Sequence, residues 1–167
     1  MKRRHPGRPR LVVGWREWAA LPELGVPAIK VKVDTGARTS ALHAFRLRRF
    51  QREGAPWVRF EVHPVQRVAR PSIAVEAVVV DERLVRSSTG HEEERPVIET
   101  VLALGSESWP IHVTLTRRDA MGFRMLLGRQ GIRGRVLVDP GRSFVLGRRV
   151  APRGEGDGPP ATARGHS

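Results

Sequence analysis

Apolar residues in this chain recur at every second position within short runs, and turn-forming residues separate the runs. The alternation is clearest at 29–33 and at 57–62. Period-two alternation is typical of a strand with one buried face. Sustained helical periodicity is absent, and a single helical turn is predicted at 129–132. Many short strands joined by turns favour an antiparallel β barrel or sandwich.

The predicted strands fill the middle of the chain. In chain order they fall within 11–18, 28–34, 40–50, 57–64, 72–87, 95–105, 109–116, 124–128, 135–139 and 143–147.

Composition separates this middle from two polar ends. Residues 1–10 carry five basic side chains and two prolines, and residues 148–167 are rich in Gly, Pro and Ala. We expect two mobile tails around one domain at 11–147. The basic N-terminus lacks the apolar core of a signal peptide, and no run approaches the ~18 apolar residues of a membrane span. A cytoplasmic protein with no membrane partner is expected.

The charge balance is strongly basic. The chain has 30 basic and 17 acidic side chains, a formal net charge of +13, and its only lysines are Lys2, Lys30 and Lys32. Arginine pairs bidentately with carboxylates and phosphates, which suggests an acidic peptide or a nucleic acid as partner. Genome base composition is an equally simple source of the arginine bias. Without cysteine, disulfides and thiolate metal or redox sites are excluded.

An aspartate ends one of the alternating runs. Asp34 follows Val33 and is itself followed by Thr35 and Gly36. Aspartate is disfavoured in strands, so its position needs a reason. One reason is a plain hairpin turn in which Gly36 supplies a positive φ. The other is catalysis, because small and hydroxylated residues follow at 37–40.

Two segments carry a resemblance to aspartic proteases. The strand, Asp-Thr-Gly and Ala-x-Thr-Ser at 29–40 resemble their active-site loop. Residues 125–130 (MLLGRQ) resemble the apolar-apolar-Gly-Arg segment of retroviral-type proteases, which packs beside that loop. The distance from Asp34 to Gly128, 128 − 34 = 94 positions, is longer than in the small viral enzymes and implies insertions.

A narrower resemblance covers 11–147. The ordered segments 14–44, 57–62, 85–98, 114–130 and 136–144 are similar to a bacterial family described both as retropepsin-like aspartic endopeptidases and as ATP-dependent zinc proteases. The first description implies an all-β fold, a retropepsin-like closed β barrel with one short helical turn. The two descriptions imply different chemistry.

The zinc and ATP chemistry finds little support in the motifs. The nearest segment to His-Glu-x-x-His is 91–95 (HEEER), where arginine replaces the second histidine and flanking Ser, Gly and Pro disfavour a helix. His43, His63 and His112 are scattered over predicted strands. No Gly-rich nucleotide-binding motif occurs. We therefore expect no metal and no cofactor, and rank a metal hydrolase last.

Aspartic chemistry requires two carboxylates that share a proton. Because the chain holds one Asp-Thr-Gly, the second carboxylate is expected from Asp34 of a second copy in a homodimer. The segment 136–141 (VLVDPG) offers Asp139 as an internal alternative, although Pro140 lacks the hydroxyl and amide hydrogen of Thr35. A tight turn is the simpler interpretation of that segment.

The resemblance implies roles for the surrounding residues. Asp34 would activate water or protonate the substrate carbonyl, Thr35 would brace the two loops, and Gly36 would let the backbone approach the substrate. Gly128 would pack under the loop. A hairpin around 87–95 has the turn residues of a water-excluding flap.

One position departs from the viral pattern. Arg38 stands where the viral enzymes have an aspartate that pairs with the arginine at position 129. Two arginines cannot pair, so Asp119, Glu99 or Asp139 would have to replace that support. Alternatively Ala37, Arg38 and Arg129 line the cleft and favour an acidic peptide or protein substrate.

The leading hypothesis is therefore a homodimeric aspartic peptidase. The rival is a catalytically silent, arginine-rich module that binds an acidic peptide, a ribosomal component or RNA. Nucleic acid is the weaker partner, because the chain has four Trp, five Phe and no Tyr for base stacking.

Overall fold

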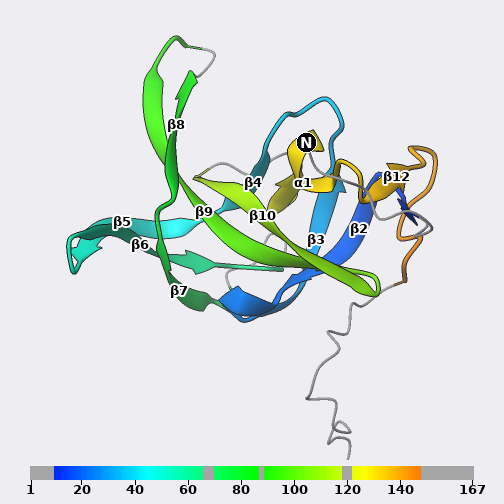
Figure 1. Cartoon of the computed structure of the whole chain (residues 1–167), viewed down its shortest axis with the longest axis horizontal. Helices are drawn as coiled ribbons and strands as arrows, with labels where there is room; N and C mark the ends of the chain where they lie inside the picture. Colours follow the sequence, from blue (N-terminus) through cyan, green and yellow to red (C-terminus); the bar gives the residue numbers. More distant parts are fainter. Residues whose placement is uncertain (1–9, 66–69, 87–88, 118–121, 148–167) are drawn as a thin grey trace, which may run out of the picture.

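Six strands close into a barrel, as predicted for the retropepsin-like fold. The computed structural model describes residues 10–65, 70–86, 89–117 and 122–147. Within them the ring runs through β10 (Glu107–Thr116), β4 (Ser40–His43), β11 (Met125–Leu127), β3 (Val26–Val33), β2 (Arg16–Leu21) and β9 (Glu92–Leu104). Pairing of β9 with β10 closes the ring (Figure 1). The predicted helical turn is confirmed as α1 (Arg129–Ile132).

Smaller elements surround the barrel. Strand β8 (Asp81–Arg86) continues the barrel sheet beyond β9, and a 3-10 turn, η1 (Pro22–Leu24), lies between β2 and β3. A separate antiparallel sheet contains β5 (Phe45–Arg52), β6 (Ala55–Val62) and β7 (Ile73–Val78). A two-stranded parallel pair joins β1 (Leu11–Val13) to β12 (Val136–Val138). No helix among the described residues is long and apolar enough to cross a membrane.

The barrel is mixed, so the prediction of purely antiparallel pairing is wrong. Strands β10 and β4 are parallel, as are β11 and β3. Consecutive strands β3 and β4 do not pair with each other, because β11 lies between them. Parallel strands need a long connection between them. A period-two pattern of apolar residues does not indicate which distant strand will pair with a given strand.

The alternating residues form the core. Ile29 and Val31 are fully buried in the barrel wall, whereas Lys30 and Lys32 between them are partly exposed. Burial of each such aliphatic side chain contributes about 1.5–3 kcal/mol. The alternation of apolar and polar positions at 29–33 therefore reflects the two faces of one strand.

Three predicted strands are each divided in the structure. The run at 11–18 divides between β1 and β2, which belong to different sheets. The run at 72–87 leaves β7 and enters β8, because the Val79 amide donates to the Pro56 carbonyl (2.9 Å) and the Val80 amide donates to the Val97 carbonyl (2.8 Å). The chain thus passes from one sheet to the other. The run at 40–50 divides at Ala44 between β4 and β5. Arg46, with a φ of 54°, lies within β5 where its register with β6 shifts.

The predicted strand at 143–147 is wrong. Phe144 has a φ of 52°, which an extended strand does not accommodate. The Val145 and Leu146 amides donate to the side chain of Glu17 rather than to a neighbouring strand. Their hydrogen bonds are satisfied by a carboxylate, so this apolar run stays irregular.

Candidate active site

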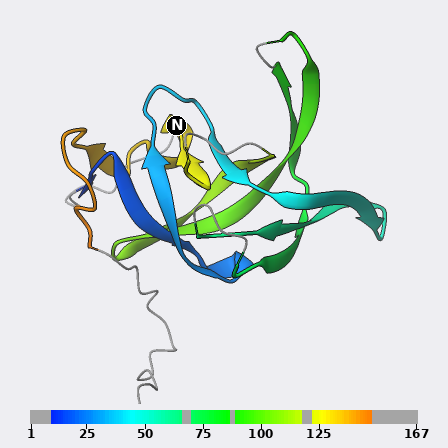
Figure 2. The same ribbon diagram turned by 180° about the vertical axis from the view of Figure 1, so that it is seen from behind.

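The Asp34 loop connects β3 to β4 at one end of the barrel (Figures 1 and 2). Its turn is held by Asp34 itself: the Gly36 amide donates to Oδ1 (2.9 Å) and the Ala37 amide donates to the Asp34 carbonyl (3.1 Å). Asp34 is half-buried, whereas Thr35 and Gly36 are exposed. The carboxylate is therefore oriented by the backbone at a surface open to a partner or substrate.

Gly36 does not have the positive φ that the hairpin-turn interpretation requires, so that expectation is wrong. A Cβ at Gly36 would stand 3.3 Å from Oδ1 of Asp34. Its missing side chain instead leaves room beside the carboxylate.

Strand β11 and α1 hold the loop from below. The Asp34 amide donates to the Leu127 carbonyl (2.8 Å), and the Arg129 amide donates to the Ala37 carbonyl (2.8 Å). Between them, a Cβ on Gly128 would overlap the backbone of Thr39. The Gly128 segment thus lies directly against the loop, at the place predicted from its sequence.

Ser40 is a further support that the motif comparison did not single out. It is buried at the start of β4, and its hydroxyl accepts a hydrogen bond from the Gly128 amide (3.1 Å). The hydroxyl satisfies an amide at the point where the two segments cross. The Thr-Ser pair that follows the loop in the sequence could have indicated this supporting role.

Arg129 meets the loop through its side chain as well. Its guanidinium donates to the Thr35 carbonyl (2.9 Å), and the Gln130 amide donates to the carbonyl of Arg38 (3.0 Å). Both arginine side chains are on exposed residues. The structure therefore brings Arg38 and Arg129 to the loop. The Arg129 guanidinium binds a backbone carbonyl there, that of Thr35, rather than a carboxylate.

The acids considered as substitutes for the viral aspartate have other neighbours. Glu99 lies 3.8 Å from His112, and Asp139 accepts from the Gly141 amide (3.2 Å). Asp119 lies outside the described residues. Within the described chain, no ion pair is recorded between Arg129 and either Glu99 or Asp139.

The Asp139 turn repeats the geometry of the Asp34 turn. The Asp139 amide donates to the Val13 carbonyl (2.8 Å), as the Asp34 amide does to Leu127, and the Arg142 amide donates to the Asp139 carbonyl (3.2 Å). Gly14 follows β1 as Gly128 follows β11, and a Cβ there would overlap Arg142. Asp139 is thus both a tight-turn residue and a structural counterpart of Asp34.

A buried carboxylate connects these two regions. Glu17 is fully buried and accepts hydrogen bonds from the amides of Gly14 (2.6 Å), Val145 (2.9 Å) and Leu146 (3.2 Å). Two residues away, the Trp15 carbonyl accepts from the Val33 amide (2.7 Å), next to Asp34. The motifs did not identify Glu17, although its period-two register with buried Ala19 predicts an inward side chain.

The predicted flap region is a hairpin. Strands β8 and β9 pair antiparallel up to Arg86 and Glu92, and the hairpin rises at the same end of the molecule as the Asp34 loop (Figures 1 and 2). Residues 87 and 88, at its turn, lie outside the described residues. The segment 92–95 is extended within β9, which confirms that HEEER is not helical.

The match of this chain to a protein-family model agrees with the observed fold. The family model for "Retropepsin-like aspartic endopeptidase RimB" matches residues 12–149. The chain belongs to this family. Its closed barrel, with β11 inserted between the strands that flank the Asp34 loop, is the retropepsin-like all-β fold.

Relatives with curated names extend the comparison. The chain is 51% identical over 138 residues to a protein from Shewanella pealeana and 55% identical over 138 residues to one from Parasynechococcus marenigrum, each named "Probable alpha-L-glutamate ligase". Each match covers 83% of this chain and 30% of the relative, so the chain spans about three tenths of the relatives' length.

A solved structure is similar as well. The crystal structure of a protein of unknown function from Legionella pneumophila has a TM-score of 0.68 and 27% sequence identity. The similarity covers 83% of this chain and 99% of that one.

The histidines lie away from the Asp34 loop's hydrogen bonds. His43 and His63 stack on opposite sides of Phe45, with ring centroids 4.2 and 3.8 Å from it, while His112 is exposed. Hydrogen bonds with Ser72 and His63 hold the pKa of Glu61 below its ordinary value. Among the described residues, no group of three or more His, Cys, Asp or Glu could hold a metal ion.

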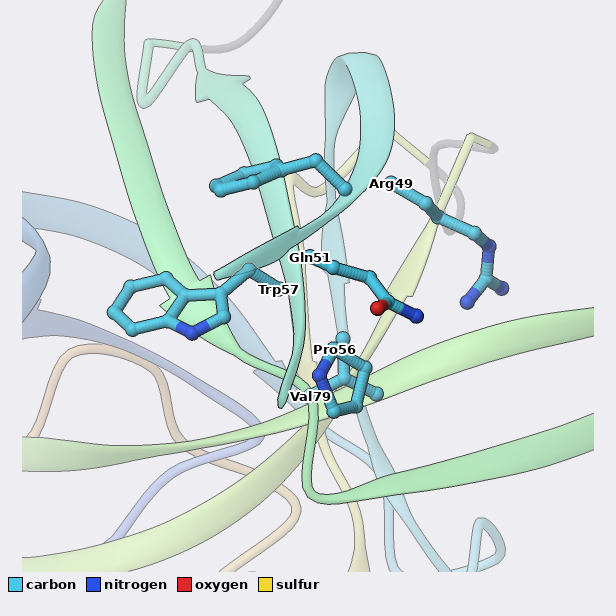
Figure 3. A pocket seen from close by; sticks show the side chains of 6 residues that line it. Arg49, Gln51, Pro56, Trp57 and Val79 are labelled. Carbon is cyan, nitrogen blue, oxygen red and sulfur yellow. The ribbon is translucent and has the colours of Figure 1, made fainter. Parts of the chain in front are cut away.

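A pocket of about 320 Å³ lies on the β5–β6 hairpin, where its lining includes Arg49, Trp57, Pro56 and Val79. Figure 3 shows Trp57 and Arg49 on opposite sides, with Pro56 and Val79 between them. None of the predicted site residues lines this pocket.

Proposed function

We propose that this chain is an aspartic peptidase that hydrolyses peptide bonds as a homodimer. The observation that carries the proposal is the Asp34 loop, with its carboxylate oriented by the Gly36 amide and its backbone held by β11. A two-fold axis at the exposed Thr35–Gly36 edge would bring two Asp34 carboxylates together. Two carboxylates in close contact cannot both ionise, which gives one acid and one base.

The chemistry follows from that pairing. The ionised Asp34 takes a proton from a water molecule, the water oxygen bonds to the substrate carbonyl carbon, and the protonated Asp34 of the other subunit gives its proton to the carbonyl oxygen. When the C–N bond then breaks, the first carboxyl group gives its proton to the leaving amine nitrogen, and the other carboxylate takes a proton from a hydroxyl of the tetrahedral intermediate. The Gly36 hydrogen bond to Oδ1 fixes the orientation of each carboxylate. Thr35, which is exposed and held at its carbonyl by Arg129, would contact the same loop of the second subunit.

Acidic peptides are the proposed substrates. Two curated relatives that contain this domain are named alpha-L-glutamate ligases, so the domain occurs beside an activity named for joining glutamate. The chain itself carries a net charge of +13, and Arg38 and Arg129 lie at the loop. Arginine guanidinium groups pair favourably with the carboxylates of glutamyl peptides.

A matched pair of variants tests the proposal. Asp34→Asn should lower kcat on glutamate-containing peptides by about 10²- to 10⁴-fold, because an amide cannot accept the water's proton. Asp139→Asn changes the same group in the same kind of turn and should retain activity. Both proteins should unfold at urea concentrations close to that of the wild type.

Two results would overturn parts of the proposal. Equal loss in both variants would indicate a dyad of Asp34 and Asp139 within one subunit. Turnover that neither variant changes would remove the aspartic mechanism, whereas absence of turnover in the wild type as well would favour the catalytically silent binding module.

A further inference from the structure

Two arginines face each other across the β8–β9 hairpin. Arg83 and Arg95 are direct cross-strand partners in the antiparallel register. Like charges at directly opposed positions destabilise a strand pair. The Arg83 side chain makes no hydrogen bond or ion pair with any other described residue, and the Arg95 side chain forms an ion pair of 3.5 Å with Glu93. The hairpin therefore has one carboxylate, Glu93, beside two opposed guanidinium groups, and its own side chains neutralise the like-charge pair only in part.

The two faces of the hairpin also differ in exposure. Leu84 is 62% exposed on one face, whereas Arg83 and Arg95 are partly covered on the other. Only 18% of the Arg95 side chain is exposed. A hairpin selected for stability alone would cover the leucine and expose the arginines. The partly buried Val85 shares the arginine face, so two partly covered guanidinium groups lie beside an apolar side chain there.

A contact on the opposite face of the hairpin shows in which direction the arginine face points. Arg49 of β5 forms a double hydrogen bond to Glu82 (2.7 and 3.1 Å) and donates to the Glu94 carbonyl (3.3 Å). Since neighbouring side chains in a strand point to opposite faces, Glu82 and Leu84 share the face beside β5. Arg83 and Arg95 are turned away from β5. In Figures 1 and 2, the β5–β6 hairpin and the Asp34 loop lie on opposite sides of β8–β9.

We propose that Arg83 and Arg95 form a carboxylate-binding pair on the flap that determines the preference for acidic substrate side chains. A glutamate carboxylate placed between the two guanidinium groups would accept hydrogen bonds from both and cancel their repulsion. The inference rests on the proposed peptidase function and adds specificity residues outside the Asp34 and Gly128 segments.

Binding to an inactive protein tests this separately from catalysis. In the Asp34→Asn background, fluorescein-labelled peptides of four glutamates and of four glutamines are titrated at low salt and their Kd values compared. Arg83→Gln and Arg95→Gln are each expected to weaken glutamate-peptide binding about ten- to hundred-fold and to leave glutamine-peptide binding unchanged. Because the two arginines are replaced separately, a folding defect in one variant leaves the other variant to test the inference.

Arg86→Gln is the matched control. Arg86 lies on the same strand, on the opposite face, 70% exposed and hydrogen-bonded to Glu92 at 2.6 Å. The Arg86→Gln change removes the same formal charge but none of the proposed contacts between the arginine pair and the substrate carboxylate. Arg38→Gln measures the competing contribution of the loop arginine.

The outcomes are distinct. Equal effects of Arg83→Gln and Arg86→Gln, or a glutamate preference that only Arg38→Gln removes, would overturn the inference. Failure of the glutamate peptide to bind would also overturn it. The proposed function is judged separately, by turnover in the Asp34 and Asp139 variants.

Discussion

Gly128 is the residue whose identity the site constrains most directly. A Cβ at this position would overlap backbone atoms of Thr39, which have no flexible end to move aside. Gly128→Ala is expected to lower the free energy of unfolding by about 1–3 kcal/mol, the usual cost of overpacking, and to reduce kcat by displacing the Asp34 loop. Urea unfolding and peptide turnover measure the two effects.

Gly141→Ala is the control for that change. A Cβ there has 3.7 Å to its nearest neighbour, Oδ1 of Asp139, and Gly141 does not have a positive φ. Its stability should stay close to that of the wild type. Equal destabilisation of the two variants would mean that close packing at Gly128 does not support the loop.

The buried carboxylate of Glu17 gives a second prediction for a single residue. Glu17→Gln replaces one acceptor oxygen with an NH₂ donor that faces backbone amides in a fully buried place. An unsatisfied buried group costs about 1–3 kcal/mol, so the urea midpoint should fall accordingly. Hydrogen exchange at Val145 and Leu146 should accelerate, whereas Glu23→Gln at the exposed η1 turn should change neither measurement. Unchanged exchange at both amides would show that Glu17 does not anchor this segment.

The sequence predicted the Asp34 and Gly128 segments because each carries an unusual local pattern. Asp-Thr-Gly after an alternating strand and Leu-Leu-Gly-Arg are visible without knowledge of their neighbours. Ser40 and Glu17 were not identified, since their importance comes from amides that are distant in the chain. Their residue types alone are compatible with many surface positions.

Individual strands were easier to predict than their partners. The alternation at 29–33 and 57–62 predicted β3 and β6 correctly, because side-chain periodicity is local. Insertion of β11 between β3 and β4 depends on contacts nearly a hundred residues apart, which leave no periodic trace. The same reason explains why the sequence did not divide the runs at 11–18, 40–50 and 72–87 between two sheets.

The contact between β5 and the β8–β9 hairpin, which is the proposed flap, gives a prediction for these elements. The hydrogen bond to Glu82 raises the pKa of Arg49 above its ordinary value. Since both side chains are more than a third exposed, Arg49→Gln should change overall stability by no more than about 1 kcal/mol. Amide exchange across β8 should nevertheless accelerate, and KM should rise as the flap loses a support.

Arg52→Gln removes a comparable pair that does not reach the flap. Arg52 bonds to Glu76 at 2.8 Å within the β5–β6–β7 sheet. Exchange across β8 should then stay as in the wild type. If the two variants affect β8 equally, the Arg49 contact has no special role in holding the flap.

For the whole molecule, the net charge of +13 and the closed barrel have separate consequences. The charge favours acidic partners over long distances at low salt, whatever the catalytic state of Asp34. The barrel positions a single Asp-Thr-Gly loop, and the aspartic mechanism requires two carboxylates. The proposed function therefore depends on association of two copies, which neither composition nor strand periodicity encodes.

Mixing wild-type and Asp34→Asn subunits tests this dependence most directly. The two proteins are refolded together at a fixed amount of wild type and increasing amounts of the variant, and hydrolysis of a glutamate-containing peptide is measured. If two Asp34 carboxylates form the site, mixed dimers are inactive, and about half of the activity should be lost at an equal ratio. Activity that stays proportional to the wild-type subunit alone would contradict a catalytic dyad shared between two copies.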